Sequence, residues 1–297
     1  MALVTSLVLA CAVCGAAEKT LPANGAEVPF DGRKRATLEL RAASFATRDG
    51  ALRVVELRAQ PGMAVAIGRD TLVGAEVPLL RRTLALEGGR SETATLGPRA
   101  REESGATSSA PSVGDVELRA THIAWRSAPS TTNRRLTIAA GLKLPTAPLE
   151  RDPAGTLVHP DLQPGCGSIV PLLGGSYVWT SSLWSAWTSA SFLFPVSVRS
   201  GAHPGDSLRA SLGLQLQPSR ILATRLGVHG RLDGTGELDG AVVRASGGAS
   251  VHVAPELVVS PTEDVVVALG ASFPVIQEMR GYRATTPVLL ASVGMDF

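Results

Sequence analysis

The chain has 297 residues, of which 44% are hydrophobic and 18% charged, and its formal net charge is +2. This composition is too apolar for a disordered protein. The 28 Lys and Arg residues are spread along the chain and form no basic stripe, so no nucleic-acid partner is expected. The 31 Gly and 20 Pro residues break helices and favour many short strands joined by turns.

The first residues have the pattern of a secretory signal. An apolar stretch runs from Ala2 to Val13 and is followed by small residues up to Ala17. No Lys or Arg precedes this stretch, so the true start and the cleavage site of the signal stay open. We interpret residues 1–17 as a signal-like segment and residues 18–33 as an N-terminal periplasmic segment.

The three cysteines point to no particular chemistry. Cys11 and Cys14 form a CxxC pair that lacks both the following His of a haem site and a second CxxC for zinc. They are interpreted as processing-site residues or as a local disulfide, and Cys166 stands alone in the sequence. We expect no metal site and no cofactor.

Alternation of apolar and polar residues is the main structural signal. Beyond the N-terminus no apolar run reaches 18 residues, which excludes transmembrane helices. Val55, Leu57 and Ala59 alternate with Glu56 and Arg58, and this period of two is typical of a strand. About twelve such strands are expected, over residues 37–44, 52–67, 71–83, 115–126, 136–144, 168–179, 184–196, 208–217, 221–232, 249–259, 265–275 and 286–297.

The connections between these strands alternate between short and long. Short turns follow the even-numbered strands and longer loops follow most of the odd-numbered ones, with both chain ends on the side of the short turns. This is the layout of a bacterial outer-membrane barrel. The fold class is therefore expected to be all-β: a single transmembrane antiparallel up-and-down barrel over residues 34–297, with short periplasmic turns, longer external loops and the lipid bilayer as its partner. Trp125, Tyr177, Trp179 and Trp184 fall beside the short turns, where an interfacial aromatic belt would lie.

Four segments and the C-terminus resemble one family of proteobacterial outer-membrane barrels. They are the stretch from Gly68 through Leu80, GlyAspValGluLeuArg from Gly114, LeuLysLeuProThrAlaPro from Leu142 and AspLeuGlnProGlyCysGlySer from Asp161, with terminal Phe297 after alternating apolar residues. Members of this family are commonly labelled as transporters or as meta-pathway phenol-degradation proteins. The resemblance spans roughly residues 34–297 and implies a channel of about twelve strands without catalytic residues.

If the apolar faces point to lipid, charged side chains enter the interior of the barrel, the lumen. The candidate lumen-lining residues are Glu56, Arg58, Glu76, Glu117, Arg119, Lys143, Arg209, Arg225 and Arg231. One hypothesis sets an acidic wall of early strands against a basic wall of later ones, which would orient polar or anionic solutes. The alternative is that these charges pair across neighbouring strands and fill a narrow lumen.

The five histidines are far apart in the sequence, and only His229 and His252 are expected to share a face of adjacent strands. No motif supports a Ser, His and acid constellation, so no enzyme is expected. The expected function is an outer-membrane channel for passive passage of small solutes through a charged lumen. The alternative is a closed barrel acting as a binding or structural partner of periplasmic machinery. The solute, the role of the CxxC pair and the oligomeric state stay undetermined by the sequence.

Overall fold

The computed structural model describes residues 34–46, 52–86, 107–108, 111–127, 133–149, 164–198, 202–238, 241–242, 246–280, 283–284 and 286–297. The predicted signal-like and periplasmic segments and the CxxC pair lie outside these residues. No helix of membrane-spanning length and hydrophobicity occurs in this described part of the chain.

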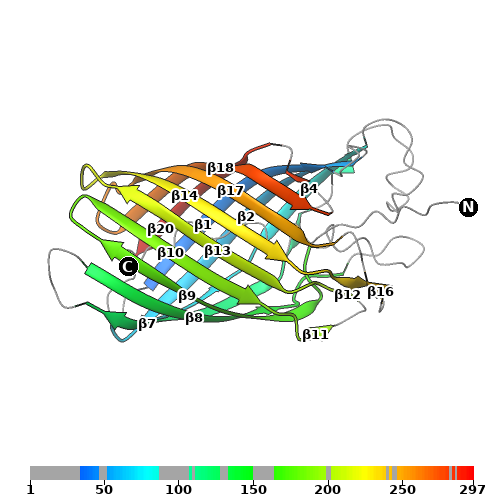
Figure 1. Cartoon of the computed structure of the whole chain (residues 1–297), viewed down its shortest axis with the longest axis horizontal. Helices are drawn as coiled ribbons and strands as arrows, with labels where there is room; N and C mark the ends of the chain where they lie inside the picture. Colours follow the sequence, from blue (N-terminus) through cyan, green and yellow to red (C-terminus); the bar gives the residue numbers. More distant parts are fainter. Residues whose placement is uncertain are drawn as a thin grey trace, which may run out of the picture.

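Twelve antiparallel strands form a closed ring, as the sequence predicted, if β3 and β4 are counted as one interrupted strand. In ring order the strands are β1 (Lys34–Ala46), β2 (Leu52–Ile67), β3 (Thr71–Glu76) with β4 (Leu79–Leu86), β7 (Val116–Arg126), β8 (Asn133–Leu144), β9 (Ser168–Thr180), β10 (Trp184–Leu193), β13 (Ser207–Leu216), β14 (Leu222–Asp233), β17 (Gly248–Val259), β18 (Val265–Met279) and β20 (Val288–Asp296). Figure 1 shows these strands running obliquely along the barrel, and such tilt is required to close a sheet into a barrel.

The two ends of the chain's barrel domain close the ring. β1 pairs with β2 on one side and with β20 on the other. The backbone groups of Lys34 and Phe297 exchange two hydrogen bonds of 2.9 Å, and Arg35 Nε lies 2.6 Å from Asp296 Oδ1. First and last strands therefore meet at the short-turn end, where the sequence placed both termini of the barrel.

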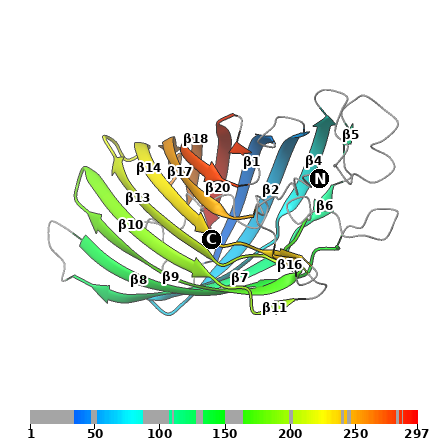
Figure 2. The ribbon, with the colours of Figure 1, turned by 45° about the vertical axis from the view of Figure 1, so that its right-hand side comes forward.

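Short strands extend the wall at the long-loop end, where Figure 2 shows β5, β6, β11 and β16. β5 (Thr107–Ser108) and β6 (Ser112–Val113) pair with β4, and β11 (Ser197–Val198) pairs with β9. A separate three-stranded sheet contains β12 (Ala202–His203), β15 (Glu237–Leu238) and β16 (Ala241–Val242). β19 (Arg283–Ala284) pairs with β1.

The third predicted strand is interrupted, and the sequence analysis did not foresee this. It was expected over residues 71–83, but Val77 and Pro78 separate β3 from β4. Proline has no N–H to donate to the ladder, and Pro78 O accepts a 2.7 Å bond from Gly114 N instead. β2 remains paired with both halves, whereas on the other side β3 pairs with β7 and β4 with β5 and β6.

The alternation predicted from the sequence separates an outer and an inner face. On β13 the side chain of Leu212 is 57% exposed, whereas its neighbour Ser211 is only 4% exposed. Apolar side chains such as Leu57, Leu173 and Leu289 remain exposed on the outside of other strands. A contiguous apolar exterior on a closed barrel matches a lipid environment, where no backbone edge is left unpaired.

Aromatic side chains gather at the short-turn end. Trp125 and Trp179 are exposed there, and Trp179 packs edge-to-face on Trp184 with ring centroids 4.8 Å apart. The guanidinium of Arg134 lies 5.4 Å from the ring of Trp179. Such amphipathic rings suit the boundary between hydrocarbon and water.

Candidate functional site

The inner face of the ring is the candidate functional site, and all nine predicted residues belong to it by strand register. Glu56 and Arg225 are each 4% exposed, and the other seven share their alternation along the paired strands. Their assignment to the lumen stays a prediction. Which of these charges contact one another depends on the register of the strands.

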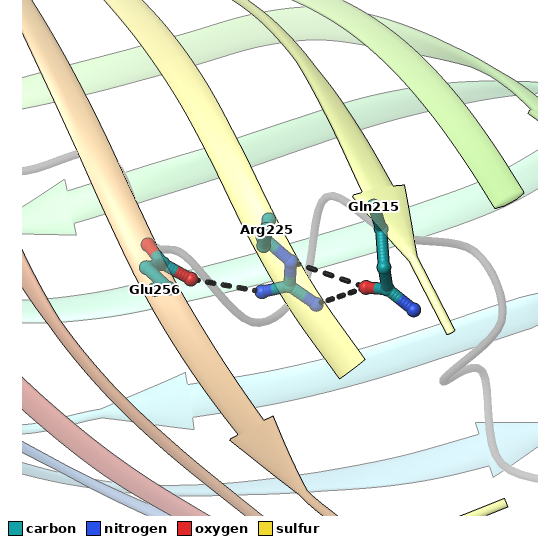
Figure 3. Close-up of polar contacts among 3 residues, drawn as sticks. All are labelled: Gln215, Arg225 and Glu256. Atoms are coloured by element: carbon teal, nitrogen blue, oxygen red, sulfur yellow. Dashed lines mark hydrogen bonds and ion pairs between the residues drawn. The ribbon is translucent and has the colours of Figure 1, made fainter. Parts of the chain in front are cut away.

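Arg225 on β14 lies at the centre of one buried polar group. Its Nη1 is 3.2 Å from Glu256 Oε2 on β17, and its Nε and Nη2 donate to Gln215 Oε1 on β13 at 3.2 and 3.0 Å. Figure 3 shows these three side chains side by side across three adjacent strands. Because Glu256 neutralises Arg225, this arginine follows the alternative in which lumen charges pair locally.

Glu56 on β2 forms a second buried ion pair. Its Oε2 accepts a 3.0 Å bond from Arg82 Nε on β4. Arg82 is a lumen residue that the sequence analysis missed, because Arg81 and Arg82 follow two leucines and the alternation is lost there. The parity from Glu76 through Leu80, which is buried, does place Arg82 inside.

The remaining acidic candidates lie together on β3 and β7. Glu76 faces Glu117 in register, and Gln60 on β2 donates to Glu76. Arg119 Nε lies 3.6 Å from Glu117 Oε1. Lys143 on β8 is the register partner of Glu117, and its Nζ donates to Cys166 Sγ at 3.3 Å.

The basic candidates form two cross-strand pairs of like charge. Arg209 on β13 faces Arg231 on β14, and Arg231 Nη2 lies 2.5 Å from Asp233 Oδ2. Arg58 on β2 faces Arg41 on β1. The predicted residues therefore divide into ion pairs, an acidic group on β3 and β7, and two arginine pairs.

The inner face of β9 and β10 carries no charged residue along its described length. Its inward side chains include Val170, Leu172, Val178, Trp187 and Leu193, all of them buried. Cys166, Val170, Leu172 and Leu193 form an apolar cluster near the long-loop end. A second apolar cluster, of Ala223, Val258 and Ala268 with Val266, lies near the short turns.

Segments that carried the family resemblance converge on one buried carboxylate at the long-loop end. Asp115 is 2% exposed, and it accepts bonds from the backbone N of Ala147 at 3.1 Å and of Cys166 at 2.5 Å. A side chain at Gly165 would collide with Asp115, since a Cβ there would lie 2.3 Å from Oδ1. Asp115 therefore ties the start of β7 to both ends of the connection between β8 and β9.

The histidines are the side chains most relevant to a possible metal site. His229 and His252 are direct register partners, and His252 Nδ1 is 3.3 Å from Ser272 Oγ. Within the described residues no group of three or more His, Cys, Asp or Glu side chains could hold a metal ion.

Comparison with known proteins identifies the architecture. No family model matches the sequence, and no curated protein matches it. The structure is similar to the COG4313 outer membrane channel from Pseudomonas putida F1, with a TM-score of 0.73 and 13% identity over 95% of this chain and 100% of that one. The chain has the fold of an outer-membrane β-barrel.

A second solved structure has the same general architecture. The transport unit of the autotransporter AIDA-I from Escherichia coli aligns with a TM-score of 0.52 and 8% identity, over 96% of this chain and 95% of that one. At such identities the likeness establishes the fold of the barrel.

Proposed function

We propose that this barrel is a channel for passive passage of small solutes across the outer membrane, and not an enzyme. The main support for this proposal is that the inner face combines charged strands with uncharged ones. Charged side chains line β13, β14 and β17, while β9 and β10 present buried apolar and small side chains from one end of the barrel to the other. Such a wall offers both apolar contact and orienting charge to a solute.

The solute class best suited to this lumen is a small molecule with an apolar body and a polar group. Trp187 with Val178, and Leu193 with Leu172, supply two apolar register pairs on adjacent strands, and small residues lie between these pairs. The guanidinium of Arg225 lies 5.6 Å from the centroid of the Trp187 ring. A small solute could therefore contact a charged group and an apolar ring at the same place. A purely hydrophilic pore would have little use for a buried tryptophan.

One observation favours a second candidate function. In this alternative the barrel is closed and serves as a binding or structural partner of periplasmic machinery. Arg41, Glu56, Arg82, Arg225 and Glu256 are all below 9% exposed. Charges on the wall of a wide aqueous pore would be far more exposed. Their burial favours a narrow lumen at these residues.

Reconstitution into planar bilayers and liposomes separates the two candidates. The channel proposal expects discrete conducting steps and uptake of a small aromatic alcohol, such as benzyl alcohol, faster than in liposomes without protein. Protein that is folded, as judged by faster migration on gels when unheated, yet neither conducts nor accelerates uptake would support the closed barrel.

A further inference from the structure

Two arginines face each other on the first two strands of the barrel. Arg41 on β1 and Arg58 on β2 are direct register partners and share the inward alternation of Ala43 and Glu56. Directly opposed residues of an antiparallel pair have Cβ atoms roughly 4.5–5.5 Å apart, and like charges at that distance are destabilising. This pairing therefore needs compensation.

Arg41 is also buried, and some of its guanidinium nitrogens have no hydrogen-bond acceptor among the described residues. It is 8% exposed, and within the described chain its Nε and Nη1 have no acceptor; the same is true of Arg58 Nε. A buried donor that is unsatisfied costs about 1–3 kcal/mol, and more when it is charged. The unsatisfied atoms belong to the two residues that already repel one another.

The charged groups around Arg41 do not remove its excess positive charge. Those that act on it electrostatically are Arg58, Glu56, Glu39 and Arg231. Glu56 is engaged by Arg82 at 3.0 Å, Glu39 offsets part of the positive charge, and Arg231 adds a further positive charge that is shared with Asp233. His252, on the other side of β20 and β18, also lies within electrostatic range of Arg41 and Arg231.

We propose that Arg41 and Arg58 form a binding site for the carboxylate of a small organic acid inside the lumen. A guanidinium presents parallel N–H donors that match the two oxygens of a carboxylate, and a bound anion would relieve both the repulsion and the unsatisfied donors. The inference deepens the proposed function, on which it rests: the solute with an apolar body carries an acidic group, which docks at Arg41 and Arg58.

Benzoate and benzyl alcohol are matched probes, because they share an aromatic ring and differ in the charged oxygens. We expect isothermal titration of the folded barrel in detergent to show saturable benzoate binding and at least tenfold weaker binding of benzyl alcohol. Arg41→Gln and Arg58→Gln should each weaken benzoate binding about tenfold, the loss expected for one charge-assisted hydrogen bond. Arg41→Lys keeps the charge but loses the fork, and is expected to fall between wild type and Arg41→Gln.

Arg135→Gln is the control variant. Arg135 lies on the inward face of β8 near the short turns, so this change removes one lumen charge away from the site. It should leave benzoate affinity unchanged. Equal affinity for benzoate and benzyl alcohol, or equal losses in Arg135→Gln and Arg41→Gln, would overturn the site. Equal binding of chloride would show an unspecific positive lumen and overturn it as well.

The failure of the site and the failure of the channel can be told apart. Uptake of benzyl alcohol into liposomes tests the channel and does not require Arg41. Uptake of benzyl alcohol without selective benzoate binding would support the channel and contradict the carboxylate site. Benzoate binding that is sensitive to Arg41→Gln, without any uptake, would leave a binding site in a closed barrel.

Discussion

The inner faces of β9–β10 and of β13–β14–β17 are built on different principles. The first holds Val170, Leu172, Val178 and Leu193 and needs no charged partner. The second holds Arg225 and Glu256, which depend on each other and on Gln215. A neutral wall contacts a solute through shape and apolar surface. On a charged wall the buried charges pair with one another, so only a polar group without such a partner is available to bind a ligand.

The two walls meet at Trp187. Its ring lies against Gly213 of β13, where an added Cβ would come within 2.2 Å of the indole. Arg225 lies over the same ring, 5.6 Å from its centroid. A glycine on the charged side thus makes room for the largest side chain of the neutral side.

The largest expected effect is on the charged wall. Glu256→Ala removes the carboxylate that neutralises buried Arg225, and removing one member of a buried ion pair costs about 3–5 kcal/mol. Urea unfolding in lipid vesicles, followed by tryptophan fluorescence, measures the change.

The matched change on the neutral wall is Ser189→Ala, which removes a 2.6 Å hydrogen bond to Ser211. A neutral hydrogen bond contributes about 0.5–1.5 kcal/mol. Equal losses in free energy of unfolding for the two variants would contradict the distinction between the walls.

The next largest effect is expected on the outer face of β13. Leu212 is exposed near the middle of β13, and Leu212→Arg should cost about 2–4 kcal/mol because it places a charge in hydrocarbon. The folded fraction on gels without heating measures this loss. Leu212→Val keeps an apolar surface and should fold like wild type, and normal folding of Leu212→Arg would mean that Leu212 does not face lipid.

A smaller effect is expected where the walls meet. Gly213→Ala forces its new methyl group against Trp187, and overpacking of this kind costs about 1–3 kcal/mol. Gly230→Ala is the control, since the nearest atom to its added Cβ is 3.8 Å away. Thermal unfolding should distinguish the two alanine variants; identical midpoints would contradict the close approach at Gly213.

The smallest effect is on ion selectivity in planar bilayers. Arg209→Ala should shift the reversal potential towards cation preference, because it removes one of two positive side chains that face each other across β13 and β14. Glu56→Gln with Glu76→Gln should shift the preference towards anions. Reversal potentials that do not move in any of these variants would mean that the lumen charges do not select ions.

Much of the fold could be predicted because a strand with one face in lipid must alternate. The predicted and observed bounds of β2 are both Leu52–Ile67, and its alternation persists over 16 residues. The break at Pro78 and the position of Arg82 were missed, because two leucines followed by two arginines carry no period of two. Arg225 was assigned to the lumen from its parity, but its partners were not.

The sequence by itself determined the barrel and its strand number, since these depend on local periodicity and on the lengths of the connections. The tertiary structure alone decided which charges pair. A contact such as Arg225 with Glu256 or Arg41 with Arg58 requires the register of neighbouring strands, and Asp115 reaches Ala147 and Cys166 only when distant segments fold together. Register follows from hairpin geometry and ring closure, which no single strand contains.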